Sequence, residues 1–486
     1  MISPASVAVA NIVPKRLSAN WLAIPAMVLL FGAAGLLQAI TLSSLSSIEN
    51  ADIWWHLRTG TWVLQNHTLP HTGLFSQSAD LSWTAPSWGY EVLLACAYKL
   101  FGLAAIAGLA VCFKVALGVA TFVLAGGLRG RFWSAMVLSG VVQYVLGSVQ
   151  PGPGYFSILL FGVELALLFN VHRNEQLQRL YWLPVVFLVW ANLDTQFVYG
   201  VALLLIFALG TVFSGGAQFD KVSRPQFAGA VAISLFASLI TPHYYKPYAV
   251  FFQSVTSAAN AYFPEFHAMS FHRPEDYVLL LLTMAAFLCL GMRRSHDLLQ
   301  IALLIACAAL SFHSQRDAWL VALAAIAIMG DSEVTTIDKQ TMKNCFVVGV
   351  VALAVSLVIV AKTAGKEALL ARVSRTYPVA AGDYIRKHRL SQPFFNAAEW
   401  GGFLTWYLPE YPVAIDGRRN LYSDDFLIQY AKVMNADVPY VTFPALADAR
   451  TILLPKSSLM GQALATLPQL RVAYSDSVAV VLVRRD

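Results

Sequence analysis

The segment Asp52-Ile-Trp-Trp-His-Leu-Arg-Thr-Gly60 follows the first long apolar run of the chain, which extends from about 21 to 42. With helical periodicity, its apolar residues fall on one face, and Asp52 and His56 fall on the adjacent face. Its two tryptophans suit a membrane interface, because an indole ring has a polar edge and an apolar body. The segment therefore predicts an amphipathic helix at a membrane surface.

The composition of the whole chain is also that of a membrane protein. Hydrophobic residues make up 58% of the 486 residues and charged residues only 12%, whereas a soluble domain carries about 25% charged residues. This excludes an ordinary soluble enzyme, a disordered chain and a fibrous repeat. The net charge of +6 does not indicate nucleic acid as a partner, because the basic residues stand in pairs between apolar runs.

Eleven apolar runs predict eleven membrane-spanning helices. Pairs of basic residues, such as Arg129 and Arg131, recur in every second connection, and cytoplasmic connections are the ones that carry an excess of Lys and Arg. This pattern predicts a cytoplasmic N-terminus and an extracytoplasmic C-terminus. The runs lie near 21–42, 102–126, 132–148, 154–170, 181–195, 198–214, 226–241, 277–292, 297–312, 317–330 and 344–362.

Two regions on the predicted outer side are too long to be simple loops, namely the first outer loop, 43–101, and the tail, 363–486. The tail alternates short apolar runs typical of strands with helix-like stretches. The expected fold is an all-α polytopic membrane bundle over 1–362, followed by a small extracytoplasmic α/β domain over 363–486. The predicted strands of the tail are 393–397, 413–415, 452–455 and 478–483, and its predicted helices include 380–388 and 424–434.

Asp52 is the candidate catalytic residue. A carboxylate at the outer membrane surface can remove the proton from a hydroxyl or amine acceptor beside a lipid-borne leaving group. Glu49 and His56 lie close enough in the sequence to assist it. The alternative is a structural interfacial helix, in which Asp52 caps the helix or is solvated and His56 is packed.

Four motifs resemble those of the GT-C superfamily of integral-membrane glycosyltransferases, and more closely those of a group of bacterial GT-C-like membrane proteins. The group shares a D-x-W-W-H-x-x-T-G segment, a W-x-N-L segment, and a tail with W-G-G-x-L followed by I-D-G-R. The chain departs from the group at Asp194-Thr195, where His-Gly is usual, and at Pro86-Ser87, where His-Glu is usual. The matching segments, in the same order, are Asp52–Gly60, Trp190-Ala-Asn-Leu193, Trp400-Gly-Gly-Phe-Leu404 and Ile415-Asp-Gly-Arg418.

The resemblance implies an activity and a location. GT-C enzymes carry a catalytic Asp or Glu early in the first outer loop, and Asp52 is at the matching place. By resemblance, the chain would move a monosaccharide, with inversion, from a polyprenyl-phosphate donor to an envelope lipid, glycan or protein acceptor on the extracytoplasmic face of the bacterial inner membrane. Some relatives use a divalent metal and others do not. The resemblance therefore leaves open whether Mg²⁺ or Mn²⁺ bridges Glu49, Asp52 and the phosphate.

Arginine suits the donor phosphate, because a guanidinium group can hold two phosphate oxygens at once. Arg316, a lone arginine on the predicted outer side, is the first candidate and Arg58 is the second. The alternative for Arg316 is simple solvation in a short loop. The side chains that we expect to contact substrate are Trp54, Trp55, Trp88, Glu91, Asn192, Asp194, Glu265, Asp416 and Arg418.

Some of these residues also have structural interpretations. Asp416 and Arg418 can form an ion pair that holds their turn, and Asn192 can satisfy broken helix backbone. Lys114 and Glu164 lie near the middle of predicted spans, where an unpaired charge is costly, so we expect them to pair with each other.

Two other functions fit the same sequence. One is an O-antigen ligase or polysaccharide polymerase, which is also a multi-span enzyme with outer loops. The other is a non-catalytic GT-C-like scaffold that binds a partner through its tail. Disruption of Asp52 separates the first from a GT-C transferase, and partner binding by the tail would favour the second.

Overall fold

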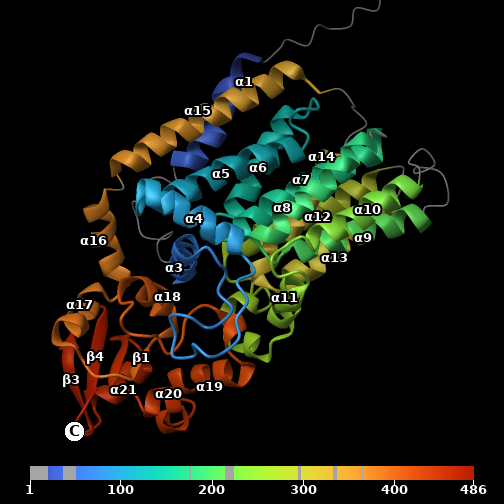
Figure 1. Cartoon of the computed structure of the whole chain (residues 1–486). Coiled ribbons are helices and arrows are strands. Elements are labelled where there is room, and N and C mark those ends of the chain that lie inside the picture. The colour runs from blue at the N-terminus through green and yellow to red at the C-terminus, as the bar shows by residue number, and fades with distance from the viewer. Residues whose placement is uncertain are drawn as a thin grey trace, which may run out of the picture.

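The structure is a computed structural model and describes residues 20–36, 51–174, 177–213, 224–293, 297–331, 337–363 and 365–485. Figure 1 shows a bundle of helices in the upper part of the view and the C-terminal elements gathered below it at lower left. The four strands of the described sheet all belong to this C-terminal part. This confirms the expected helical bundle with a small sheet at the C-terminus.

Each of the eleven apolar runs contains a helix. By length and composition, four of the described helices can cross a membrane, namely α5, α7, α12 and α15. The expected count of eleven spans is therefore not confirmed. The helices of the bundle are α1 (Asn20–Met27) with η1 (Val28–Gly32), α5 (Ala104–Leu124), α6 (Phe132–Val145), α7 (Gly154–Asn174), α8 (Leu183–Leu193), α9 (Phe197–Phe213), α10 (Arg224–Ser238), α12 (Pro274–Met292), α13 (Leu298–His313), α14 (Ala318–Gly330) and α15 (Lys339–Thr363).

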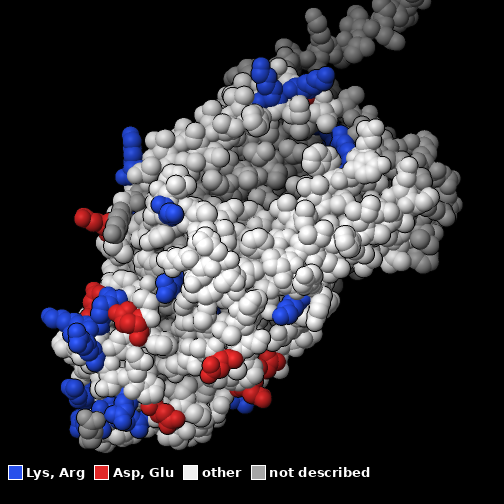
Figure 2. Space-filling model, in the orientation of Figure 1, with Lys and Arg blue, Asp and Glu red and all other residues white. Residues whose placement is uncertain are grey.

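The outer surface of the bundle is apolar. On the face shown in Figure 2, most charged side chains lie over the C-terminal elements or at the upper end, and the helices between them form a broad white surface. Large apolar side chains such as Leu281 and Leu288 of α12 and Val350 of α15 are exposed there, as lipid contact requires. In contrast, α14 is buried on all sides from Trp319 to Ile328.

The predicted pairing of Lys114 with Glu164 is wrong. The Lys114 ammonium donates hydrogen bonds to the carbonyl oxygens of Leu146 (2.8 Å) and Gly147 (3.0 Å), just after the end of α6. A cation is favourable at a helix C-terminus, where the last carbonyl groups have no partner within the helix. Glu164 is fully buried against Gly200, and in the described part of the chain its carboxylate has no hydrogen-bond partner.

The first outer loop contributes two helices, α3 (Ala51–Asn66) and α4 (Trp88–Phe101). They pack closely at Gly60, because a Cβ atom at this position would lie 1.9 Å from the carbonyl oxygen of Glu91. Short elements from other outer segments lie nearby: α11 (Lys246–Thr256), η3 (Ala258–Tyr262), η4 (Pro264–Phe266) and η5 (Gln315–Asp317).

The C-terminal sheet has the strand order β1-β2-β4-β3. Strand β1 is parallel to β2, and the other two pairs are antiparallel. The elements from α16 onward are α16 (Lys366–Thr376), α17 (Val379–His388), β1 (Phe394–Asn396), α18 (Ala398–Tyr407), η6 (Arg419–Leu421), α19 (Asp424–Met434), η7 (Tyr440–Thr442), α20 (Pro444–Ala447), β2 (Thr451–Pro455), α21 (Leu459–Ala465), β3 (Leu470–Ser475) and β4 (Ala479–Arg484).

Three of the four predicted strands and both predicted helices of the tail are confirmed. The run 413–415 is not part of the sheet. Val413 instead forms a single bridge to Ser76 of the first outer loop, so this segment joins the tail to the loop. Strand β3 was not predicted, because it is an edge strand with mostly accessible residues and lacks a continuous apolar run.

Candidate active site

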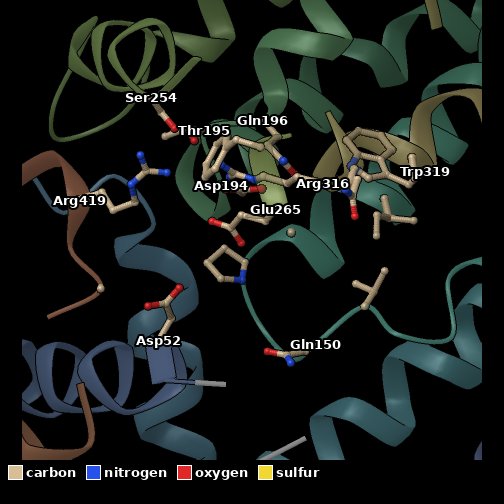
Figure 3. A pocket seen from close by; sticks show the side chains of 18 of the residues that line it. Asp52, Gln150, Asp194, Thr195, Gln196, Ser254, Glu265, Arg316, Trp319 and Arg419 are labelled. Atoms are coloured by element: carbon tan, nitrogen blue, oxygen red, sulfur yellow. The ribbon is translucent and has the colours of Figure 1, made fainter. Parts of the chain in front are cut away.

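A cavity of ≈ 560 Å³ lies where the first outer loop, the other outer segments and the tail meet. Figure 3 shows acidic and basic side chains from several elements turned toward this space. The residues that line it and that the sequence singled out are Asp52, Trp55, His56, Asp194, Glu265, Arg316 and Arg418. The structure thus brings most of the predicted charged residues together although they are distant in sequence.

Asp52 lies in the first turn of α3 and is half-buried. Its Oδ1 atom accepts a hydrogen bond of 3.0 Å from Trp55 Nε1. Desolvation and the negative charges of Glu265 and Asp416 together raise the pKa of Asp52 to about 6, although the hydrogen bond from Trp55 and the charge of Arg316 act in the opposite direction. A carboxylate with such a pKa is ionised at neutral pH and is a stronger base than an ordinary Asp, which suits a general base.

The tail forms one wall of the site at Gly417. A Cβ atom at Gly417 would lie 1.8 Å from Asp52 Oδ1 and 3.0 Å from Trp55 Nε1. Only a residue without a side chain can bring its backbone this close to Asp52. The sequence indicated a turn at Gly417 but gave no sign of this contact.

The residues on either side of Gly417 hold the turn in place. Arg418 Nη2 lies 2.7 Å from Asp416 Oδ2, and Arg418 Nε lies 3.1 Å from both carboxylate oxygens. Both side chains are buried, which confirms the structural ion pair. The guanidinium carbon of Arg418 also lies 4.9 Å from the ring of Trp83. Substrate contact by Asp416 or Arg418 stays a prediction.

His56 and Glu91 form a buried pair behind Asp52. His56 Nδ1 and Glu91 Oε1 are 3.2 Å apart. Burial lowers the pKa of His56 to about 3 and raises the pKa of Glu91 to about 8, so the two groups form a neutral hydrogen bond at pH 7 rather than an ion pair. His56 is therefore a poor proton acceptor. Glu91 does not line the cavity, and substrate contact by Glu91 stays a prediction.

Arg316 faces the cavity with its guanidinium group uncommitted. Its guanidinium carbon lies 5.2 Å from the ring of Phe266, and within the described residues it has neither a hydrogen bond nor an ion pair. Burial lowers its pKa, but the negative charges of Glu265, Asp317 and Asp194 outweigh this and raise it. Arg316 therefore stays positively charged and has free donors for an anion in the cavity.

Arg419 is a cavity residue that the sequence reasoning missed. Its guanidinium carbon lies 4.3 Å from the ring of Phe263 and 4.4 Å from that of Phe266, and its Nη2 atom donates to Asn260 Oδ1 (2.8 Å). In Figure 3 it projects toward the cavity from the side of the tail. Its only sequence signal is its position next to Arg418 in the I-D-G-R segment.

Two predicted site residues, Trp54 and Arg58, lie away from the cavity. Trp54 is fully buried between Tyr377, Phe403 and Trp406 of the tail side, so it anchors α3 and cannot contact substrate. Arg58 does not line the cavity; its guanidinium carbon lies 4.9 Å from the ring of Phe75. The expected roles of these two residues are corrected on this ground. Glu49 lies outside the described residues.

Trp88 and Asn192 also face another surface. Trp88 Nε1 donates to Asn192 Oδ1 (2.9 Å), and Asn192 Nδ2 donates to the carbonyl oxygens of Leu188 and Ile240. The amide of Asn192 thus satisfies backbone groups, as one interpretation of the sequence predicted. Both side chains line an apolar groove next to the cavity instead of the cavity itself.

The described residues do not supply a metal site. They contain no group of three or more His, Cys, Asp or Glu side chains placed to hold an ion. Oδ1 of Asp52 accepts the hydrogen bond from Trp55, and both carboxylates and arginines line the cavity. No chemical step proposed below uses a metal.

Comparisons with known proteins give the fold. No protein-family model matches the sequence, and no curated protein sequence matches it. One similar structure is the oligosaccharyltransferase of Archaeoglobus fulgidus, solved with a tethered acceptor peptide. The match covers 90% of this chain and 69% of the oligosaccharyltransferase chain, with 10% sequence identity and a TM-score of 0.52.

A second similar structure is ArnT from Cupriavidus metallidurans, solved with undecaprenyl phosphate. The match covers 96% of this chain and 98% of the ArnT chain, with 14% sequence identity and a TM-score of 0.47. The chain therefore shares the fold of the Archaeoglobus fulgidus oligosaccharyltransferase over most of its length.

Proposed function

We propose that this chain is a GT-C glycosyltransferase that moves a monosaccharide from a polyprenyl-phosphate donor to a hydroxyl or amine acceptor. One observation carries this proposal: a single cavity holds a carboxylate with a raised pKa, Asp52, and an uncommitted cation, Arg316. In Figure 3 these two side chains lie on opposite sides of the cavity. Displacement of a phosphate from a sugar carbon requires a base for the acceptor and a group that binds the leaving phosphate, on opposite sides of that carbon.

The chemistry follows from this arrangement. Asp52 takes the proton of the acceptor, and the acceptor atom forms a bond to the anomeric carbon of the sugar. The bond between this carbon and the phosphate oxygen breaks, and polyprenyl phosphate leaves with its electron pair. Arg316 offsets the negative charge that develops on the phosphate. A single displacement from the side opposite the leaving group inverts the configuration at the anomeric carbon.

The surroundings of the cavity support a lipid donor. Arg419 adds a second cation near the proposed phosphate position. The apolar groove at Trp88 and Asn192 begins two residues from Asp194, which lines the cavity, so it offers a path for the polyprenyl chain. We place the cavity and the domain 363–486 on the extracytoplasmic side of a bacterial inner membrane, with the N-terminus in the cytoplasm, as the basic residues predict.

The experiment compares cells that carry the wild-type protein, Asp52→Asn, or the control Asp383→Asn, whose carboxylate is exposed on the tail away from the cavity. Lipid-linked glycans, envelope glycolipids and glycoproteins are compared by mass spectrometry. We expect a sugar-modified species with the wild type and the control but not with Asp52→Asn. The mass difference then identifies the sugar.

A folded Asp52→Asn protein that still forms this species would overturn the mechanism. If Asp52→Asn still transfers a glycan polymer, an O-antigen ligase or polysaccharide polymerase is the better explanation. If neither the wild type nor Asp52→Asn alters any glycan, a scaffold that binds a partner through its tail is the better explanation.

A further inference from the structure

A second, smaller pocket lies at the end of the bundle far from the candidate active site. Helix α7 begins at Gly154, which lines the active-site cavity, and its 21 residues extend about 30 Å toward this pocket. The pocket has a volume of ≈ 170 Å³. Its described lining residues are Val123, Leu124, Leu128, Arg129, Ala166, Phe169, Asn170, Arg173, Arg179, Ala327 and Ile337.

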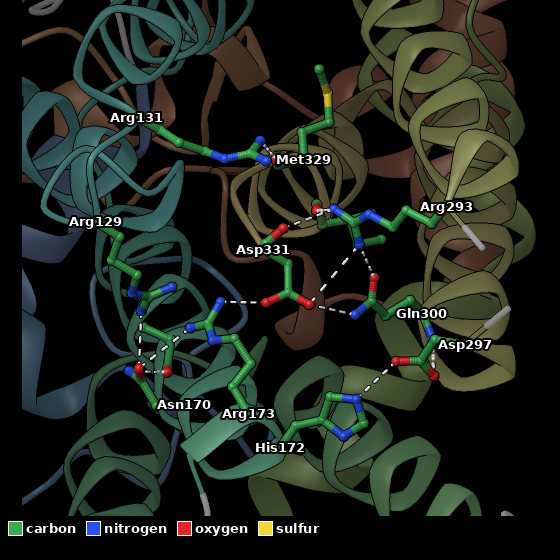
Figure 4. Close-up of polar contacts among 12 residues, drawn as sticks. Arg129, Arg131, Asn170, His172, Arg173, Arg293, Asp297, Gln300, Met329 and Asp331 are labelled. Carbon is green, nitrogen blue, oxygen red and sulfur yellow. Dashed lines mark hydrogen bonds and ion pairs between the residues drawn. The ribbon is translucent and has the colours of Figure 1, made fainter. Parts of the chain in front are cut away.

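Three arginines line this pocket, and their donors converge. Arg129 Nη2 and Arg173 Nη2 lie 2.9 and 3.3 Å from the same acceptor, Asn170 Oδ1. Figure 4 shows the guanidinium groups of Arg129, from the connection after α5, and of Arg173, from the last turn of α7, at this amide. One neutral oxygen thus accepts from two cations, and of the two only Arg173 also pairs with a described carboxylate, that of Asp331.

The third arginine and one buried donor have no partner. Arg179 forms no hydrogen bond or ion pair with any described residue. The side chain of Arg173 is only 10% exposed, and its Nε atom has no hydrogen-bond partner among the described residues. A buried donor of this kind is costly unless a ligand or water completes its hydrogen bond.

Among the described residues, the carboxylates near the pocket are fewer than its arginines, and none of them lines it. Asp331 pairs with Arg173 and also lies 4.0 Å from Arg293, as Figure 4 shows. Asp338 follows the lining residue Ile337, and its carboxylate accepts hydrogen bonds from Thr341 and from the backbone of Gln340. Burial and the positive charge of Arg173 together lower the pKa of Arg129 to about 10, although the negative charge of Asp331 acts in the opposite direction. An anion in the pocket would relieve this repulsion.

We propose that this pocket binds the phosphate group of an anionic phosphoester, either a phospholipid headgroup or a free phosphate ester. Guanidinium groups bind phosphate oxygens in pairs, and Arg129, Arg173 and Arg179 all line this one pocket. The remaining walls are apolar, which suits a headgroup whose chains continue into the membrane. Basic pockets between helices on the cytoplasmic side hold anionic lipid headgroups, and the basic residues predict this end to be cytoplasmic.

This proposal does not depend on the proposed function, because the pocket lies at the other end of the bundle. Its test uses the purified full-length protein in a neutral detergent. The affinity for each of three probes is measured by the shift in thermal unfolding temperature during titration. The probes are phosphatidylglycerol, phosphatidylcholine and glycerol 3-phosphate.

The variant is Arg179→Gln, which removes a charge without breaking a hydrogen bond or ion pair among the described residues. The control is Lys343→Gln, an exposed lysine at the same end of the bundle that does not line the pocket. Loss of one charge-assisted hydrogen bond weakens binding about tenfold or more. We expect this loss for phosphatidylglycerol with Arg179→Gln and no change with Lys343→Gln.

Each outcome decides the proposal. Binding of phosphatidylglycerol without binding of glycerol 3-phosphate identifies a lipid headgroup, and equal binding of both identifies a free phosphate ester. If no anionic probe binds, or if Arg179→Gln and Lys343→Gln weaken binding equally, the pocket is not a phosphate site. Native mass spectrometry of lipid retained by each variant checks the result without relying on unfolding.

Discussion

Replacement of Gly417 by alanine tests whether the tail shapes the active site. The added methyl carbon would lie 1.8 Å from Asp52 Oδ1 and 3.0 Å from Trp55 Nε1, whereas ordinary contacts begin at 3.4 Å. Either the turn or the Asp52 carboxylate must therefore move by roughly 1.5 Å, because the added methyl carbon and Oδ1 would otherwise overlap.

The expected effect is larger on catalysis than on stability. A displacement of about 1 Å at a catalytic group costs about 100-fold in rate, so we expect sugar transfer by Gly417→Ala to fall about 100-fold. Overpacking of this size costs about 1–3 kcal/mol in the free energy of unfolding, so we expect the variant to fold. The two effects together distinguish a displaced base from a collapsed protein.

The assay measures sugar transfer and thermal unfolding on the same purified samples. Gly365→Ala is the matched control, because Gly365 also belongs to the C-terminal part and a Cβ atom there would meet no atom within 4 Å. We expect Gly365→Ala to behave as the wild type in both measurements. Wild-type transfer rates with Gly417→Ala would refute the inference that this turn rests on the catalytic carboxylate.

Three further substitutions test individual residues. The pKa of Asp52 is about 6, and a general base must be unprotonated, so the pH–rate profile of the wild type should show the transfer rate falling as the pH drops below about 6. The rate of Asp52→Asn should be about 10²–10⁴-fold lower than that of the wild type. Arg316→Ala should lower kcat/KM for the polyprenyl-phosphate donor about 10- to 100-fold, and an unchanged value in steady-state kinetics would remove Arg316 from the phosphate site. Trp54→Ala should lower the free energy of unfolding by about 3–5 kcal/mol, and thermal unfolding that matches the wild type would contradict its anchoring role.

The sequence predicted the elements of the fold well where periodicity or apolar length is strong. Each apolar run contains a helix, and strands β1, β2 and β4 coincide with short apolar runs. Prediction failed where the neighbours come from distant segments. The run 413–415 is apolar because it is buried between the first outer loop and the rest of the tail. A short apolar run is expected both there and in a strand of the sheet, so the sequence alone does not separate the two.

Within the site, the sequence predicted residue types better than contacts. Asp52, Glu265 and Arg316 were chosen for their charge in an apolar chain, and all three line one cavity. Trp54 and Trp55 are adjacent in sequence, yet one is buried in the tail side and the other donates to Asp52. The helical rotation of about 100° between neighbours separates them, and only the docked tail determines which of the two faces the cavity.

The basicity of Asp52 therefore belongs to the assembled protein and not to the first outer loop alone. Two causes of its raised pKa come from other segments: Glu265 from η4 and Asp416 from the tail. The largest cause, desolvation, depends in part on the backbone of Gly417, which covers one side of the carboxylate. If the tail were absent, Asp52 would be more hydrated and would lose the repulsion of Asp416, so its pKa would fall toward that of an ordinary Asp. The conservative variant Asp416→Asn removes that negative charge and should therefore move the acidic limb of the pH–rate profile to lower pH.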